Sequence, residues 1–266
     1  MEGRCEYKYL LRGSEIDELR RKIAGQIPPD SHGGGKPYTV SSLYFDNADR
    51  RLYYQTYDRA PYRYKLRLRF YGEPVGGDAD SFFEIKSKLM GNSVKRRLLL
   101  PLSENERLWQ SGRLPEGISP DGRRIAHDIL NLIEYDRLEP AAVVSYERLA
   151  FAAPGSARLR VTFDSALRIR TDRLDLRLGT GGTAVMPEDF CVLELKSGEN
   201  LPLWLTRLIS EHRLANRSYS KYGQTRFPDK LLQNNKINSL SQGESSWETI
   251  SAESSAASDR SIQAQF

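Results

Sequence analysis

The sequence contains few of the residues that most enzymes use for covalent or metal chemistry. It has two cysteines, Cys5 and Cys191, and three histidines, His32, His127 and His212. Neither residue type stands at the spacing of a zinc site, and no nucleophile elbow or kinase signature occurs. The cysteines are therefore predicted to be small buried side chains in a reducing compartment.

The chain also lacks long hydrophobic runs. The longest, such as "RRLLLPL" and "LPLWL", are far shorter than the ~18 residues that a membrane span needs. The beginning, "MEGRCEYKYLL", has no apolar centre of the kind found in a signal peptide. We therefore expect a cytoplasmic protein with no membrane span of its own.

Charge is only slightly unbalanced. Forty Lys and Arg stand against 35 Asp and Glu, which gives a net charge of +5 and favours an anionic partner. Residues 229–266 are rich in Ser, Gln, Asn and Glu and contain few core-forming side chains, which predicts a disordered tail. Function is expected in one domain, residues 1–228.

Alternation of polar and apolar residues dominates that domain. Eight segments show the pattern of strands: "RCEYKYLL", "YTVSSLYFD", "YRYKLRLRFYG", "SFFEIKSKL", "SVKRRLLLP", "AAVVSYERLAF", "RLRVTFDSALRIR" and "FCVLELKSG". Helical periodicity appears at 14–27, with Ser14 as N-cap, and at 48–57, 103–111, 121–137 and 202–214. Strands without regular helical crossovers predict an α+β fold on a closed or strongly curved antiparallel sheet.

The strands separate charge from apolar residues. In "YRYKLRLRF", residues 62–70, four cations share one face and Tyr, Leu and Phe share the other, because successive strand side chains point to opposite sides. A solvated outer face would show the same alternation. However, cations outnumber acids on these faces, and like charges on neighbouring strands repel. A basic concave surface that binds a polyanion explains that excess, since the ligand cancels the repulsion.

Three acids lie among these cations. Glu6, Glu84 and Glu194 each stand two residues before a lysine. One interpretation is that they hold a divalent metal that also contacts phosphate oxygens. The other is that each acid simply pairs with its lysine neighbour, and the sequence does not decide between the two.

The motifs resemble a known family, the VTC domain, which is the polyphosphate polymerase domain of the vacuolar transporter chaperone within the CYTH-like triphosphate tunnel metalloenzymes. The resemblance covers roughly residues 4–224 through "EYKYLL", "SSLYFDN", "YKLRLRFY", "FFEIKSK", "VKRR", "YERLAF", "VTFD", "LELKSG" and "SYSKYG", in the family's order. It implies a closed eight-stranded antiparallel β-barrel, a triphosphate tunnel, with flanking helices. It also implies transfer of the γ-phosphate of ATP onto polyphosphate with Mn²⁺ or Mg²⁺.

The resemblance also implies roles for individual residues. The catalytic cations would be Lys8, Arg67, Arg69, Lys86, Arg148 and Lys221. Further substrate contacts would be Lys95, Arg97, Arg160 and Lys196, and the metal-binding carboxylates would be Glu194 and Glu6. Many tunnel hydrolases begin with two or three alternating glutamates, whereas here Arg4 precedes Glu6, which favours transfer over hydrolysis.

Two alternatives stay open: an inorganic tri- or polyphosphatase on the same fold, and a non-catalytic module that binds polyphosphate. A nucleic-acid partner is not expected, because the aromatic residues of 62–70 lie on the face opposite the arginines and cannot stack on bases beside them. Attack by a terminal phosphate on ATP needs no general base, since that phosphate is already anionic at neutral pH. This agrees with the scarcity of histidine and cysteine.

Overall fold

The fold is built on one curved antiparallel sheet. The computed structural model describes residues 5–72, 78–90, 92–154, 159–198 and 200–225. The strands are β1 (Cys5–Arg12), β2 (Tyr38–Asp46), β3 (Tyr62–Tyr71), β4 (Asp80–Leu89), β5 (Asn92–Pro101), β6 (Glu139–Ala152), β7 (Arg160–Arg170), β8 (Thr183–Ala184) and β9 (Phe190–Ser197). The eight predicted strands are confirmed, and the two-residue β8, which pairs only with β7, is an addition.

Strand order differs from chain order at one end of the sheet. The order is β1-β9-β7-β6-β2-β3-β4-β5. Strands β2 to β5, and likewise β6 and β7, are neighbours both in the chain and in the sheet, whereas β1 pairs with β9 from the other end of the domain. All described ladders are antiparallel. The sheet therefore brings residues near the start of the chain, such as Lys8, beside residues near its end, such as Glu194.

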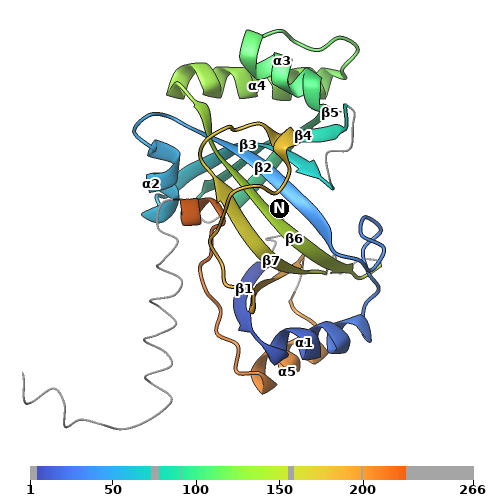
Figure 1. Ribbon diagram of the computed structural model, residues 1–266. Helices are drawn as coiled ribbons and strands as arrows, with labels where there is room; N and C mark the ends of the chain where they lie inside the picture. Colours follow the sequence, from blue (N-terminus) through green and yellow to red (C-terminus); the bar gives the residue numbers. More distant parts are fainter. Residues whose placement is uncertain (1–4, 73–77, 91, 155–158, 199, 226–266) are drawn as a thin grey trace, which may run out of the picture. The chain divides into compact units, whose positions relative to one another are not determined.

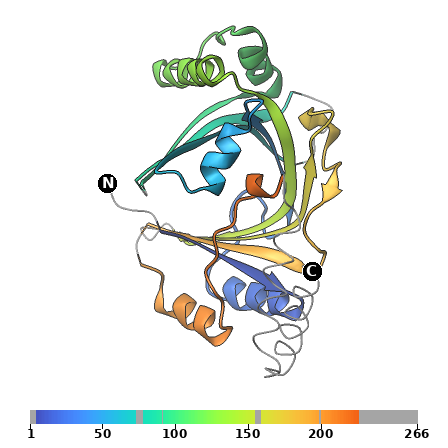
Figure 2. The ribbon, with the colours of Figure 1, turned by 90° about the vertical axis from the view of Figure 1, so that its left-hand side faces the viewer.

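Helices cover the outer face of the sheet in two groups (Figures 1 and 2). Helices α3 (Leu102–Ser111) and α4 (Pro120–Asp136) pack on β3 to β5, and α1 (Ser14–Ala24) and α5 (Leu203–Glu211) pack on β1, β7 and β9. Each group has its own apolar core: Leu66, Leu68 and Phe83 lie in the first, and Leu193 and Leu195 in the second. The five predicted helices are confirmed, the fifth being α2 (Arg51–Tyr57).

The inner face of the sheet carries the charges. In β3, Tyr64, Leu66, Leu68 and Phe70 are buried in the outer core, so Lys65, Arg67 and Arg69 point to the other side. The same alternation places the predicted charged faces of β1, β4, β7 and β9 together on the side away from α1, α3, α4 and α5. We call this side, towards which the sheet curves in Figure 2, the concave face.

Closure of the sheet into a barrel is not confirmed. Within the described ranges no ladder joins the end strands β1 and β5. Side chains nevertheless reach from one end to the other, since the ammonium of Lys86 on β4 lies 3.5 Å from the carboxylate of Glu6 on β1. The described part of the chain is thus a curved sheet whose ends approach each other through side chains.

A segment near the end of the described chain crosses the concave face. We call residues 216–225, which include the 3₁₀ turn η2 (Tyr222–Thr225), the strap. It begins at the free edge of β1, where the amide of Arg217 donates to the carbonyl of Lys8 at 2.8 Å. It ends beside α2, where the Tyr222 hydroxyl donates to Asp46 at 2.6 Å and its ring stacks on Tyr44.

Some details of the prediction need correction. Ser14 is the first residue of α1 and not its cap; Gly13, with φ +58°, precedes it, and no side chain caps that end. The 3₁₀ turn η1 (Leu176–Leu178) is also new. The predicted tail, residues 229–266, lies outside the described residues. Within the described ranges, no helix is long and apolar enough to cross a membrane.

Candidate functional site

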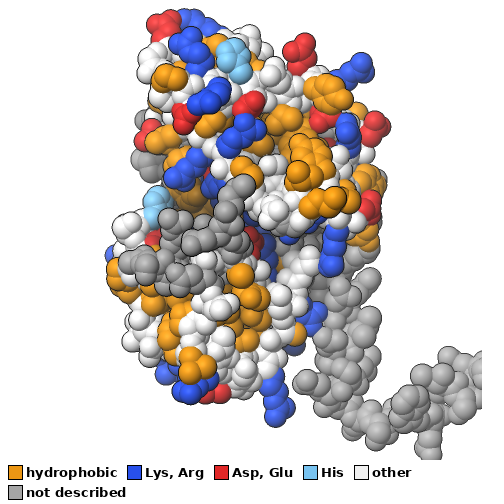
Figure 3. All heavy atoms as spheres, turned by 180° about the vertical axis from the view of Figure 1, so that it is seen from behind, with side chains coloured by type: hydrophobic (Ala, Val, Ile, Leu, Met, Phe, Trp, Pro, Cys, Tyr) orange, Lys and Arg blue, Asp and Glu red, His pale blue; other side chains and the backbone are white. Residues whose placement is uncertain are grey.

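Cations outnumber carboxylates on the concave face and the segments that touch it. The cations are Lys8, Lys65, Arg67, Arg69, Lys86, Lys95, Arg97, Arg148, Arg160, Lys196 and Lys221, and the carboxylates are Glu6, Asp30, Glu84, Asp164 and Glu194. On the face of the molecule seen in Figure 3, Lys and Arg side chains lie scattered among acidic, hydrophobic and other side chains. We call the charged side chains of β1, β7 and β9 the acidic wall, and those of β3, β4 and β5 the arginine wall.

Two carboxylates lie together on the acidic wall. Glu6 and Glu194 are diagonal neighbours across the β1–β9 ladder, where Glu6 faces Lys196 and Lys8 faces Glu194. Lys8 lies 2.8 Å from Glu6, and Lys196 lies 2.5 Å from Glu194. Two lysines on the same pair of strands thus offset the repulsion between the two carboxylates.

Electrostatics keep both carboxylates ionised. Burial acts to raise the pKa of Glu194, but Lys196, Lys8 and Lys221 hold this pKa well below its ordinary value. For Glu6, burial and the charge of Glu194 raise the pKa, and Lys8 and Lys86 outweigh them and lower it. Burial lowers the pKa of Lys196 to about 8 despite its two acidic neighbours.

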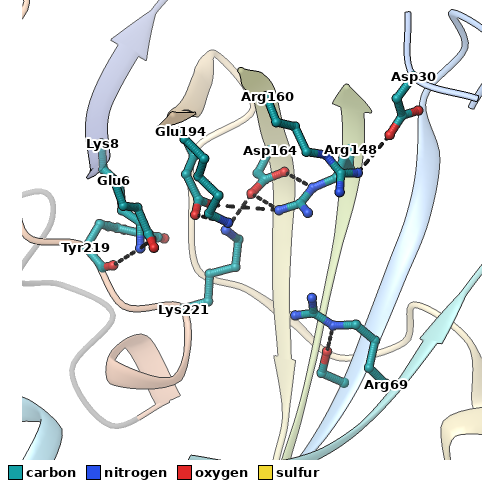
Figure 4. A network of polar contacts seen from close by, with 12 residues as sticks. Glu6, Lys8, Asp30, Arg69, Arg148, Arg160, Asp164, Glu194, Tyr219 and Lys221 are labelled. Atoms are coloured by element: carbon teal, nitrogen blue, oxygen red, sulfur yellow. Dashed lines mark hydrogen bonds and ion pairs between the residues drawn. The ribbon is translucent and has the colours of Figure 1, made fainter. Parts of the chain in front are cut away.

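In the middle of the concave face, the carboxylate of Asp164 binds two further cations (Figure 4). Arg148 donates to both oxygens of Asp164, each at 2.7 Å, and Lys221 of the strap lies 2.5 Å from Oδ2. Arg148 also lies 3.9 Å from Glu194, which links this cluster to the carboxylate pair. Burial acts to raise the pKa of Asp164, and Arg148 and Lys221 lower it overall.

The arginine wall has one carboxylate, and it is fully engaged. Glu84 is completely buried; Arg67 Nη2 lies 2.7 Å from Oε2, and Lys95 contacts Oε1. Although burial acts to raise the pKa of Glu84, Arg67, Arg69 and Lys95 lower it to about 2. With both oxygens paired to cations, Glu84 orients Arg67 and Lys95 and is poorly placed to hold a metal.

Besides the exposed Arg97, two cations on this wall make no ion pair among the described residues. Arg69, which is buried, donates to Ser42 Oγ at 3.1 Å, and Lys65 donates to Ser220 Oγ of the strap at 3.0 Å. Buried charge without counter-charge is unfavourable. A bound polyanion would remove that cost, so these cations are suited to phosphate.

Two of the predicted substrate-contacting residues, Arg160 and Arg97, lie away from the Glu6–Glu194 pair. Arg160 is 38% exposed and pairs with Asp30 at 2.7 Å and with the Tyr38 hydroxyl, away from the carboxylate pair. Arg97 is exposed and lies over the ring of Phe82 at 4.8 Å; within the described ranges it makes no ion pair. The structure therefore places all the other predicted cations on one face and leaves Arg97 and Arg160 at its margins. Lys8, Lys86, Arg148, Lys196 and Lys221 gather around Glu6, Glu194 and Asp164, and Arg67 and Lys95 gather around Glu84 beside Arg69.

The interpretation that each acid pairs with the lysine two residues later holds for two of the three acids. Glu6 and Glu194 do pair with the lysines two residues later, Lys8 and Lys196. For Glu84 this interpretation is wrong, because its partners are Arg67 and Lys95 on the neighbouring strands. Arg67 is the residue directly opposite Glu84, and opposite residues lie closer than residues two apart along one strand.

The donor set fits an oxygen-preferring divalent metal. Glu6 and Glu194 supply ionised carboxylates, whereas the described residues contain no group of three or more His, Cys, Asp or Glu that could hold a metal by themselves. Mg²⁺ is commonly bound through one or two carboxylates with substrate phosphates and water as the remaining ligands. These residues therefore suit a metal that arrives with phosphate.

Sequence reasoning missed several residues of this network. The residue roles implied by the family resemblance include neither Asp164 nor Lys65. Tyr44 and Tyr146 also lie on the concave face, beneath Arg67 and Arg148 at 5.8 and 5.2 Å from ring centroid to guanidinium carbon. The alternation of "VTFD" with Arg160 was a signal for Asp164, but no pattern in residues 216–225 indicated the strap.

The rings on the concave face lie under the cations and not beside them in solvent. Tyr44 and Tyr146 are both buried, at 4% and 2% exposure. A base could stack only on an exposed ring, so this arrangement gives no platform for nucleic acid at these two positions.

Comparison with known proteins agrees with the sequence motifs. A family profile described as the VTC domain matches residues 3–226. In Schizosaccharomyces pombe, vacuolar transporter chaperone complex subunit 4 is 26% identical over 81% of this chain and 36% of its own, and subunit 2 is 26% identical over 78% of this chain and 32% of its own. The chain thus spans about a third of the length of these relatives.

A solved structure shares the fold. A Bacillus halodurans protein, provisionally named an adenylate cyclase, superimposes with a TM-score of 0.50 over 85% of this chain and 98% of its own. Sequence identity is 16%, so the likeness concerns the fold alone.

Proposed function

The chain belongs to the VTC domain family, and we propose that it is a metal-dependent polyphosphate polymerase. It would transfer the γ-phosphate of ATP onto a polyphosphate chain bound on the concave face. The observation that carries this proposal is the connected network of cations around the Glu6–Glu194 pair. No neutral substrate would compensate so many cations on one face.

The transfer step is a displacement at the γ-phosphorus. A terminal oxygen of polyphosphate forms the new P–O bond, the bond between the γ-phosphorus and the β,γ-bridging oxygen breaks, and ADP leaves with that electron pair. The attacking phosphate is already anionic, so no proton has to be removed. The main barrier is repulsion between two anions, and it is lowered by cations fixed in place before the substrate arrives.

The contacts of each residue indicate its part in lowering this barrier. Arg67 is oriented by Glu84 and Tyr44, and Arg148 is oriented by both oxygens of Asp164, so their guanidinium groups are held in one direction. Fixed donors of this kind stabilise charge that develops on phosphate oxygens. Glu6 and Glu194 would hold Mn²⁺ or Mg²⁺, which supplies Lewis-acid polarisation of phosphate oxygens when bound.

Closure into an eight-stranded tunnel around the polymer is part of the proposal. The Glu6–Lys86 contact and the strap support it, because they connect β1 with β4 and with α2. A cytoplasmic location, where ATP is available, is also proposed. Arg4, on which the preference for transfer over hydrolysis depends, lies outside the described residues.

The test is product analysis with purified protein. Incubation with ATP and Mn²⁺ should give long polyphosphate, resolved by gel electrophoresis, together with one ADP per phosphate transferred. EDTA should stop the reaction. Release of ADP and free phosphate without chain growth would replace the polymerase with a hydrolase. Tight polyphosphate binding without any turnover, unchanged by EDTA, would leave a binding module.

A further inference from the structure

Lys65 is a charged side chain of the concave face that the motif comparison did not include. It lies two residues before Arg67 on the same side of β3. Across the sheet it faces Lys86 on β4, which in turn faces Lys95 on β5. Three lysines therefore form a row across three adjacent strands of the arginine wall.

The surroundings of Lys65 are unfavourable for an ammonium group. Burial, and then the charges of Lys86, Lys8 and Arg67, lower the pKa of Lys65 well below its ordinary value. Its hydrogen-bond partner is the neutral Ser220 Oγ at 3.0 Å, and within the described ranges no carboxylate lies at ion-pair distance. Lys8, Lys95 and Lys221, by contrast, each contact a carboxylate.

A purely structural role does not explain this choice of residue. A neutral side chain such as Gln could also donate to Ser220 and would avoid the repulsion from three neighbouring cations. A lysine is the better residue only if an anion enters the space between these cations. The same hydrogen bond connects Lys65 to the strap, one residue away from Lys221.

We propose that Lys65 is a further phosphate-contacting residue, and that its contact with Ser220 couples the bound phosphate chain to the strap. This inference rests on the proposed function, because it places phosphate on the concave face. It adds to that function the prediction that Lys65 has opposite effects in two states. Lys65 destabilises the free protein and strengthens its complex with polyanion.

The experiment uses Lys65→Gln, Ser220→Ala and the conservative Lys65→Arg. The matched control is Arg96→Gln, which removes one positive charge from the outer face of β5, where Arg96 pairs with Asp128 of α4. For each full-length protein, the dissociation constant for tripolyphosphate is measured by titration calorimetry, and the thermal midpoint is measured with and without tripolyphosphate.

Lys65→Gln should raise the dissociation constant at least about tenfold, the loss expected for a charge-assisted hydrogen bond. Its thermal midpoint without ligand should rise above that of the wild type. Lys65→Arg should recover most of the affinity, Ser220→Ala should weaken binding less than about threefold, and Arg96→Gln should bind as the wild type does.

Two results would overturn the inference. In the first, Lys65→Gln lowers the midpoint while affinity is unchanged, which makes Lys65 a structural support of the strap. In the second, Ser220→Ala weakens binding as much as Lys65→Gln, which means that the lysine acts only through the strap. Failure of the proposed function is distinguishable, because it appears in the wild-type protein, which would then form no polyphosphate whether or not it binds tripolyphosphate.

Discussion

The acidic wall and the arginine wall use carboxylates for different purposes. On the acidic wall, Glu6 and Glu194 lie beside each other. Each has one lysine at 2.8 or 2.5 Å, whereas the cation nearest its other oxygen, Lys86 or Arg148, lies 3.5 or 3.9 Å away. On the arginine wall, Glu84 is completely buried and both of its oxygens are occupied by cations. The comparison teaches that a carboxylate among many cations is suited to bind a metal only where close ion pairs do not engage both of its oxygens.

The largest effect should follow from removing a cation of the arginine wall that has no carboxylate partner. Arg69→Ala should lower polymerase turnover by about 100- to 1000-fold, as loss of a preorganised charge-stabilising donor does. Its stability should change little, because the partner left behind is the neutral Ser42. Steady-state kinetics and urea unfolding measure the two quantities.

Arg96→Ala on the outer face is the control for this variant, and it should retain full turnover. Arg67→Ala is less informative, because it also removes an ion pair of the buried Glu84. Near-normal turnover in Arg69→Ala would show that the arginine wall does not contact the reacting phosphates.

A second experiment tests whether Glu84 is structural. Glu84→Gln should lower the free energy of unfolding at pH 7 by about 3 kcal/mol, the cost of leaving buried cations without their counter-charge. In the wild type, the pKa of Glu84 is lowered to about 2 in the folded state, below its ordinary value of 4.5. The stabilisation is therefore complete above pH 4.5 and is lost as the pH falls towards 2.

Urea unfolding of both proteins across this pH range provides the measurement. The difference in unfolding free energy between wild type and Glu84→Gln should shrink as the pH falls from 4.5 towards 2. If the difference in unfolding free energy stays constant with pH, protonation of Glu84 does not cause the loss of stability in acid. That result would weaken the contrast between the two walls.

The smallest effect is expected on metal affinity. Glu6→Gln should raise the Mn²⁺ concentration for half-maximal activity about tenfold, with turnover at saturating metal within about threefold of the wild type. Glu18→Gln, which removes an exposed carboxylate from α1, is the control. An unchanged Mn²⁺ requirement would exclude Glu6 as a metal ligand and leave Glu194 as the candidate on the acidic wall.

The sequence predicts which side chains share a face of the sheet. It predicts only some of the ion pairs that these side chains make. Strict alternation in "YRYKLRLRF" fixes which side chains share a face, because a strand has a period of two. It does not give strand order, so it could not show that Glu84 meets Arg67 from β3 and Lys95 from β5. Pairing depends on register between strands that are separate in the sequence.

The strap illustrates a second limit. Residues 216–225 have neither helical nor strand periodicity. Their placement depends on hydrogen bonds to β1, β2, β3 and β7 and on the stacking of Tyr222 on Tyr44. Ser220 and Asp164 therefore gain their roles from long-range contacts that no local pattern encodes. Lys221 was found only because a family motif includes it.

The strap also has a consequence for how a long product would behave. It is held at the edge of β1 by Arg217 and at the end of β2 by Tyr222, so it crosses the concave face over the strands between β1 and β2. A polymer lying beneath it could slide lengthwise but could not be lifted off sideways. Under the proposed function, a chain that has been threaded would remain attached through many rounds of addition, and synthesis would be processive, giving a few very long molecules before most primers are extended.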